Sequence, residues 1–306
     1  MCVDNVVATQ QPLVPSTTTS ALKTFVPTNY TIVPGFFVQD DPDFDATGFN
    51  LLNHSFGLKD EASPTRWFNF QHKISMLNQQ ADQHTIYKVL FVARHGQGYH
   101  NVAEAKYGTR PWNEYWSRIE GDGNITWGPD PLLTPLGLDQ AKANNVAWKQ
   151  QLQDGVPLPE SLYSSPLSRS AKTLELTWQD VVIEPRRIRP LFKERLRETI
   201  GLHTCDRRSD KSVLAKRFPA FDFEPSFSEH IFATDSNTYI SITAHGGMIN
   251  ALFRVVGHRH VPILPGGFIP MVVKATDDNK QSSELLAGGQ SVKAGPLPTA
   301  PPHVEL

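Results

Sequence analysis

The tetrapeptide Arg94-His95-Gly96-Gln97 combines residue types that suit the transfer of a phosphoryl group to an imidazole. A neutral ring nitrogen of histidine can act as the nucleophile when the other nitrogen is held as a hydrogen-bond donor. Arginine offers a planar fork of N–H groups to phosphate oxygens, and glycine lets the backbone approach a ligand closely. The tripeptide Arg-His-Gly also occurs by chance in many proteins, so it indicates a function only together with other groups.

Two further segments could supply such groups. Residues 164–173 are predicted to form a turn that opens a helix, with Arg169 in the first turn, where a helix N-terminus also favours anions. His245 is followed by Gly246, Gly247 and a helical pattern, whose free N–H groups could face the same anion. The simpler alternatives are a solvated helix charge for Arg169 and a buried structural role for His245.

Each histidine follows an apolar segment that is typical of a strand. Residues 85–93 (TIYKVLFVA) stop at Arg94, and residues 239–244 (YISITA) stop at His245. Near-continuous apolar runs indicate strands that are covered on both faces. Because ligands of such sheets bind at the carboxyl ends of parallel strands, the two histidines are expected at one edge of the sheet.

The remaining pattern alternates between strands and helices. Helices are predicted at 134–152, with Thr134 as the N-cap and Pro135 in the first turn, at 168–178 and near 248–256, and further strands at 162–164, 181–188 and 268–274. This alternation predicts an α/β fold, a three-layer α/β/α sandwich with a mostly parallel central sheet.

The chain is expected to form a single domain over residues 30–275. Residues 1–29 and 276–306 are polar and rich in Pro, Gly, Ser or Thr, which predicts flexible tails. The aromatic-rich stretch 30–84 is expected to fold onto the catalytic core, 85–275. The aromatic insertion 104–130 is either a substrate lid or a loop packed on the domain.

Composition excludes several classes of protein. The 306 residues include 29 basic and 31 acidic ones, which leaves no global charge to drive binding to nucleic acid or to an anionic membrane. No apolar run reaches the length of about 18 residues that a transmembrane helix needs, and the N-terminus lacks the pattern of a secretory signal. The two cysteines cannot form a disulfide framework. A soluble cytoplasmic protein is expected, one that could also be nuclear, while its oligomeric state is left open.

The segments together resemble the histidine phosphatase superfamily, in its phosphoglycerate-mutase-like branch, over about residues 85–275. The pieces that carry the resemblance follow the order of the family: Arg94-His95-Gly96-Gln97 with Asn101, Leu133-Thr134 with Gly137 and Gln140-Ala141, Ser164-Ser165 with Arg169-Ser170-Ala171 and Thr173, a downstream glutamate, and Ala244-His245-Gly246-Gly247. Each piece is weak alone, and the ordered set is specific.

The resemblance implies a role for each matching residue. His95 would be the phosphorylated nucleophile, and Arg94, Arg169 and His245 would complete a positively charged catalytic pocket around the phosphoryl group. The predicted substrate-binding residues are Arg94, Gly96, Gln97, Asn101, Arg169 and Gly246. Since arginines and histidine can neutralise a phosphate, and no clustered metal-ligand spacing is present, neither a metal nor another cofactor is expected.

The proton donor is expected to be one of two glutamates in the segment 193–201 (KERLRETIG). A carboxyl that protonates the leaving oxygen and then activates water suits this role. The stretch Arg-Glu-x-x-Gly followed by Cys205-Asp206 resembles a fungal and plant phosphatase-like subgroup and favours Glu198 over Glu194. The other glutamate would then be a surface ion-pair partner, and Cys205 a packing residue.

The predicted activity is hydrolysis of a small-molecule phosphomonoester. The secreted acid phosphatase branch is disfavoured, because Gly98 and His100 stand where that branch has Arg and Pro. A mutase is the alternative enzyme, disfavoured because the segment 201–243 is shorter than the mutases' insertion. A non-catalytic phospholigand-binding module is the third hypothesis. The basic residues Arg195, Arg197, Arg207, Arg208 and Lys211 could bind a second anionic group or be solvated surface charge.

Overall fold

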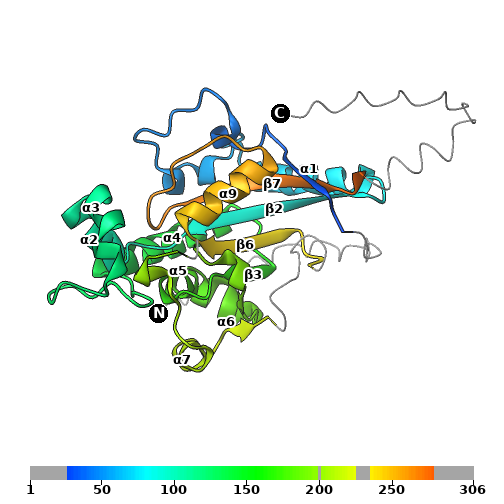
Figure 1. Ribbon diagram of the computed structural model, residues 1–306. Helices are drawn as coiled ribbons and strands as arrows, with labels where there is room; N and C mark the ends of the chain where they lie inside the picture. Colours follow the sequence, from blue (N-terminus) through cyan, green and yellow to red (C-terminus); the bar gives the residue numbers. More distant parts are fainter. Residues whose placement is uncertain (1–25, 199–200, 225–234, 279–306) are drawn as a thin grey trace, which may run out of the picture.

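A seven-stranded sheet in the order β1-β7-β2-β6-β3-β4-β5 organises the described part of the chain (Figure 1). The computed structural model describes residues 26–198, 201–224 and 235–278. The predicted tails, 1–29 and 276–306, lie largely outside these ranges. The strands are β1 (Asn29–Ile32), β2 (Thr85–Arg94), β3 (Ser161–Ser164), β4 (Leu191–Phe192), β5 (Asp222–Phe223), β6 (Tyr239–Ala244) and β7 (Phe268–Thr276).

The pairing of the strands confirms the predicted sheet. Parallel pairing joins β2 to β6, β6 to β3, β3 to β4 and β4 to β5. β7 runs antiparallel to both β2 and β1. In the β2–β6 ladder Arg94 lies opposite Ala244, so both strands stop at the same level. The residues that follow them, His95 and His245, are therefore neighbours at the carboxyl edge of the sheet.

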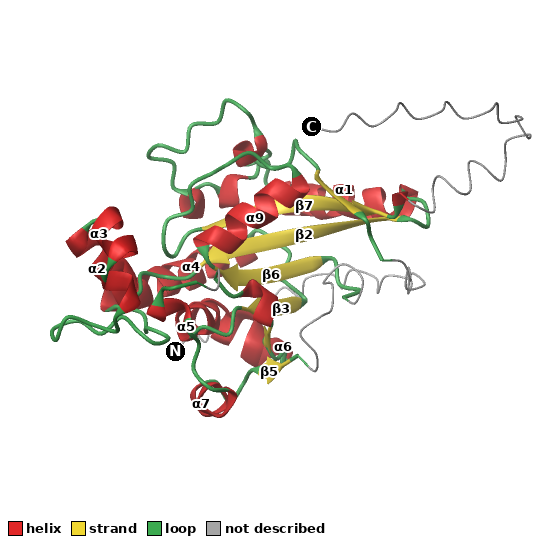
Figure 2. Ribbon diagram, in the orientation of Figure 1, coloured by secondary structure: helices red, strands yellow, loops and turns green. Residues whose placement is uncertain are grey.

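Helices cover both faces of the sheet, as the three-layer prediction requires (Figure 2). The helices are α1 (Arg66–Gln80), α2 (Tyr99–Tyr107), α3 (Thr109–Glu114), α4 (Pro135–Gln153), α5 (Ser168–Trp178), α6 (Glu184–Arg186), α7 (Lys211–Arg217) and α9 (Gly246–Val256). Phe91 of β2 packs in a core with residues of α1, α4 and α5, and the adjacent Leu90 packs in a second core with residues of α9. Successive side chains of β2 point to opposite faces of the sheet and so pack in two separate hydrophobic cores.

The helix α4 begins where the sequence predicts. The hydroxyl of Thr134 accepts a hydrogen bond from the N–H of Gly137 at 3.1 Å, and Pro135 occupies the first helical position. An N-cap hydroxyl satisfies an N–H that has no partner within the helix. This start is important for the site, because the first turn of α4 lies against Gly96.

The predicted strand at 181–188 is wrong. Instead, α5 continues through a π-helical turn, Gln179–Ile183, into α6, and the apolar side chains at 181–183 are buried in the core as part of this helical segment. Arg187 then takes a left-handed conformation (φ 54°), and β4 forms only at Leu191. A short β-branched run has the same composition in a buried strand and in a buried helix, so periodicity does not distinguish the two.

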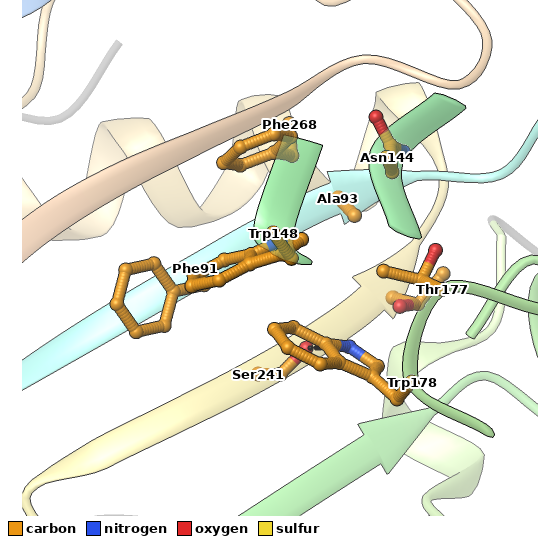
Figure 3. Close-up of a pocket in the computed structure, with 9 residues that line it drawn as sticks. Phe91, Ala93, Asn144, Trp148, Thr177, Trp178, Ser241 and Phe268 are labelled. Carbon is orange, nitrogen blue, oxygen red and sulfur yellow. Dashed lines mark hydrogen bonds between the residues drawn. The ribbon is translucent and has the colours of Figure 1, made fainter. Parts of the chain in front are cut away.

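The stretch 30–84 contributes large aromatic side chains to the core. Phe37, Phe56, Trp67 and Phe70 are buried, and Phe56 packs 4.5 Å from Trp148 of α4, measured between ring centroids. A small gap remains in this core between β2, β6, α4 and α5. Figure 3 shows it lined by both aromatic and polar side chains, among them Trp148, Trp178 and Asn144. The gap lies between the sheet and the helices α4 and α5, and none of the predicted site residues lines it.

The insertion 104–130 forms a separate aromatic cluster. Its members are Ala103, Trp112, Trp127 and Cys205, with Tyr107, Trp116, Ile119 and Ile125 packed against them. The rings of Tyr107 and Trp116 stack with centroids 3.8 Å apart. The insertion therefore packs against the segment around Cys205, which also contacts Arg169. No helix in the described ranges has both the length and the apolar character to cross a bilayer.

Two adjacent residues test whether 30–84 is integral to the core. Trp67 is fully buried, and its indole N–H donates to Gln151 at 2.8 Å, whereas Phe68 is 65% exposed. Trp67→Ala is expected to lower the free energy of unfolding by about 3–5 kcal/mol, and Phe68→Ala by less than about 0.5 kcal/mol. Urea unfolding followed by circular dichroism measures both. Equal losses of unfolding free energy in the two variants would show that burial of the Trp67 side chain does not stabilise the fold.

Candidate active site

The two predicted histidines meet at the end of the sheet. His95 follows β2, its backbone N–H donates to the carbonyl of Ala244 at 3.0 Å, and its ring centroid lies 5.0 Å from that of His245. Both side chains are buried. The parallel pairing of β2 and β6 therefore brings together residues that are far apart in the sequence.

The ring of His95 is oriented by its own neighbour. Its Nδ1 lies 2.7 Å from the carbonyl oxygen of Gly96, and because a carbonyl can only accept, Nδ1 carries the proton. The lone pair is then on Nε2, the atom that would attack phosphorus. Gly96 is required by close packing: a Cβ at this position would lie 2.4 Å from the carbonyl oxygen of Gly137.

Two guanidinium groups supply the positive charge. Arg169 is 1% exposed and donates to the carbonyl of Cys205 at 2.8 Å and to Oδ1 of Asp206 at 3.0 Å. Arg94 donates to the carbonyl of Ile263 at 2.9 Å. The Nε atoms of both arginines are buried without a hydrogen-bond partner among the described residues. Buried N–H groups of this kind are costly unless a ligand or water satisfies them, which suits an anion-binding pocket.

The histidines are held neutral by their surroundings. Burial, and then the charge of Arg169, hold the pKa of His95 well below its usual range, although the hydrogen bond to Gly96 acts in the opposite direction. Burial and Arg169 likewise lower the pKa of His245. A neutral His95 keeps its nucleophilic lone pair at neutral pH.

His245 is held by two hydroxyl groups, one from the turn after β3 and one from α5. Its Nε2 lies 2.8 Å from Oγ of Ser165 and 3.2 Å from Oγ of Ser170, while Nδ1 is buried without a partner in the described structure. The segment 164–173 therefore supplies the Arg169 guanidinium and also positions the second histidine, His245.

The structure also places His100 in this pocket, a position that the sequence interpretation used only to exclude another branch. Its ring centroid lies 5.2 Å from that of His95. The available signal was its place in the first turn of the helix that follows His95, α2, because such a turn stays close to the preceding strand end.

The two candidate proton donors have different surroundings. Oε2 of Glu198 accepts a hydrogen bond from the N–H of Gly247 at 3.3 Å, in the first turn of α9, and its charge also acts on Arg94. Glu194 forms ion pairs with Arg197 at 2.8 Å and with Arg208 at 3.1 Å. Glu198 thus lies beside the pocket, and Glu194 is occupied by two arginines.

Three predicted substrate-binding residues have structural partners. The amide oxygen of Gln97 accepts from the hydroxyl of Thr134 at 2.8 Å, and the amide oxygen of Asn101 accepts from the N–H of Gly98 at 2.9 Å. Gly246 opens α9, and a Cβ at this position would lie 3.6 Å from Cζ of Arg94. These residues shape the loops around His95, and their contact with substrate stays a prediction.

One group of side chains has the spacing of metal ligands. His203, Cys205 and Asp206 place one potential ligand atom each within 4.8 Å of one another. The carboxylate of Asp206 is paired with Arg169, and burial raises the pKa of the Cys205 thiol to about 12. In the described structure Cys205 and Asp206 both contact Arg169, which the Cys205 carbonyl and the Asp206 carboxylate orient.

The predicted surface cations are partly paired. Arg207 pairs with Glu120, and Arg197 and Arg208 both pair with Glu194. Because these arginines are paired with glutamates, the contacts favour the interpretation as surface charge over a second anion-binding site.

Comparison with known proteins identifies the family. No family model matches the chain. A probable phosphoglycerate mutase of Arthroderma benhamiae is 38% identical over 283 residues, which cover 80% of this chain and 84% of the relative. The chain belongs to the histidine phosphatase superfamily, in its phosphoglycerate-mutase-like branch. Phosphomutase-like protein 3 of Candida albicans is 30% identical over 270 residues, covering 80% of this chain and 79% of the relative.

Solved structures give weaker matches to this superfamily member. A putative alpha-ribazole-5'-P phosphatase of Escherichia coli is 16% identical and has a TM-score of 0.38, covering 60% of this chain and 90% of that one. A phosphoserine phosphatase of Entamoeba histolytica, in complex with 3-phosphoglyceric acid, is 16% identical with a TM-score of 0.34, covering 60% and 89%. Membership of the superfamily, shown by the sequence relatives, makes the protein a phosphatase or a mutase.

The buried neutral histidines predict a dependence of stability on pH. A histidine whose folded-state pKa lies below its usual value of 6.5 binds a proton more readily in the unfolded chain. The free energy of unfolding is therefore highest above about pH 6.5 and falls as the pH decreases below it.

His245→Asn is expected to make this fall less steep, because the variant lacks one of the groups that titrate on unfolding. His72→Asn, on the exposed side of α1, is the control for replacing a histidine at the surface. Urea unfolding between pH 5 and 8 measures the slopes. An identical slope in wild type and His245→Asn would contradict the assignment of a buried neutral ring.

Proposed function

We propose that this protein hydrolyses phosphomonoesters through a phosphohistidine intermediate on His95, without a metal ion. The observation that carries the proposal is the state of the His95 ring: Nδ1 is held by the Gly96 carbonyl, so Nε2 is left with its lone pair. Two arginines lie beside it, Arg169 buried and Arg94 half-buried, and the Nε atom of each is buried without a partner among the described residues. A nucleophile next to preorganised cations is the arrangement that phosphoryl transfer needs.

The first step forms a bond between Nε2 of His95 and phosphorus and breaks the bond from phosphorus to the ester oxygen. Arg94 and Arg169 neutralise the charge on the phosphoryl oxygens. Glu198, in its protonated form, transfers its proton to the leaving oxygen, and an alcohol departs. The Nδ1–H of His95 stays hydrogen-bonded to Gly96 throughout, so the phosphorylated ring keeps its orientation.

The second step returns the enzyme to its starting state. Glu198, now ionised, accepts a proton from water, and the water oxygen attacks the phosphohistidine. The phosphorus–nitrogen bond breaks, and inorganic phosphate leaves. Glu198 is suited to both roles, because its carboxylate accepts from the N–H of Gly247 in the first turn of α9 and its charge acts on Arg94. Glu194 is less suited, because its two carboxylate oxygens are engaged by Arg197 and Arg208.

A comparison of the two glutamates tests the assignment. Glu198→Gln is expected to lower kcat by about 10²–10⁴-fold with an alkyl phosphate, the usual loss for a general acid. The loss is expected to be smaller with p-nitrophenyl phosphate, whose leaving oxygen needs less protonation. Glu194→Gln is the matched control, expected to change kcat by a few-fold at most. A larger loss from Glu194→Gln would reverse the assignment.

A mutase is the second candidate, because a curated relative is named a probable phosphoglycerate mutase. The segment 201–243, between the glutamate and the second histidine, is shorter than the mutases' insertion and favours hydrolysis. With 3-phosphoglycerate and catalytic 2,3-bisphosphoglycerate, we expect release of inorganic phosphate that is unaffected by EDTA. Formation of 2-phosphoglycerate without net phosphate release would establish the mutase instead, and loss of activity in EDTA would contradict metal independence.

A further inference from the structure

A third histidine, His100, faces the reaction centre without a described structural role. It lies in the first turn of α2, its side chain is 8% exposed, and its ring centroid is 5.2 Å from that of His95. Its Nδ1 is buried without a partner, and the described structure shows no hydrogen bond from either ring nitrogen. A buried imidazole with no protein partner is costly unless a ligand or water completes it.

The loop before α2 leaves room for this ring. A Cβ on Gly98 would lie 2.7 Å from Nδ1 of His100, so any larger residue at 98 would push the ring away. Gly98 itself has φ −99° and ψ 164°, a conformation that any residue can adopt. The absence of a side chain at this position therefore serves the placement of His100 and not the conformation of the backbone.

The charges around His100 are those of the proposed phosphoryl pocket. Burial, and then the charges of Arg169, His95 and Arg94, lower the pKa of His100 well below its usual range. A neutral imidazole still has one N–H group, which can donate to an oxygen of an anion. The ring thus adds a hydrogen-bond donor next to the guanidiniums without adding to their mutual repulsion.

We propose that His100 is a phosphoryl-binding residue that donates a hydrogen bond to an oxygen of the substrate phosphate and of the phosphate product. The inference rests on the proposed function for the identity of the anion. It predicts that the affinity for inorganic phosphate depends on His100, whether or not turnover is measured. The role is one of binding, so KM and the inhibition constant of phosphate are expected to change more than kcat.

The test compares His100→Ala, His100→Asn and His100→Gln with wild type. We expect His100→Ala to weaken the binding of inorganic phosphate, measured by calorimetry, by about 10- to 100-fold, the range expected for a hydrogen bond to a charged group. Asn carries its amide near the position of Nδ1 and Gln near that of Nε2, so one of them is expected to recover part of the affinity. His84→Ala is the matched control: His84 is also 8% exposed but lies before β2, at the far end of the strand.

Gly98→Ala supplies a second route to the same contact. It is expected to weaken phosphate binding in the wild-type background and to have little further effect in a His100→Ala background, since its clash is with the His100 ring. Circular dichroism and urea unfolding show which variants are folded.

The inference is overturned if folded His100→Ala binds phosphate within two-fold of wild type, or if its loss is matched by His84→Ala or recovered by neither amide. Wild-type protein that binds phosphate but releases none from phosphomonoesters would contradict the proposed function alone. The variants would still decide the role of His100. Wild-type protein that binds no phosphate would overturn both proposals.

Discussion

The parallel pairing of β2 with β6 is the constraint on which the site depends. Because Arg94 lies opposite Ala244, the residues that follow them place two imidazole rings 5.0 Å apart. The same ladder sets where α2 and α9 begin, and so where His100 and the N–H of Gly247 lie. A shift of one residue in this register would separate the histidines and turn every side chain of β2 to the opposite core.

The second constraint is positive charge held in a buried place. Arg169 is almost fully buried, and its guanidinium is oriented by the Cys205 carbonyl and the Asp206 carboxylate, with one N–H left unpaired. Burial, and then the charge of Arg169, hold the pKa of His95 well below its usual range and keep its ring neutral. A bound phosphate would satisfy the unpaired donors and balance the charge. The aromatic insertion contributes by supporting the segment that holds Arg169.

Much of this arrangement is predictable from the sequence because it rests on local patterns. The apolar runs before Arg94 and His245 and the capped start at Thr134 each indicate their element, and the order of the motifs indicates the pocket. The helical continuation at 181–183 was not predictable, since its burial comes from tertiary contacts that do not alter the composition of the run. His100 was missed because its proximity to His95 depends on the turn between them, which only the three-dimensional structure gives. That Arg208 is a partner of Glu194 was also not predictable, because the contact brings together two segments that are separate in the sequence.

The central claim is that His95 becomes covalently phosphorylated. Rapid quenching of the enzyme with a ³²P-labelled phosphomonoester tests it most directly, with wild type, Glu198→Gln and His95→Asn measured side by side. The account predicts that the wild type carries a label that is labile in acid and stable in base, and that His95→Asn carries none. Glu198→Gln is predicted to retain the label with substrates for which phosphorylation of His95 is faster than hydrolysis of the phosphohistidine. A label of the same chemistry on His95→Asn, or turnover of wild type with no such label, would contradict it.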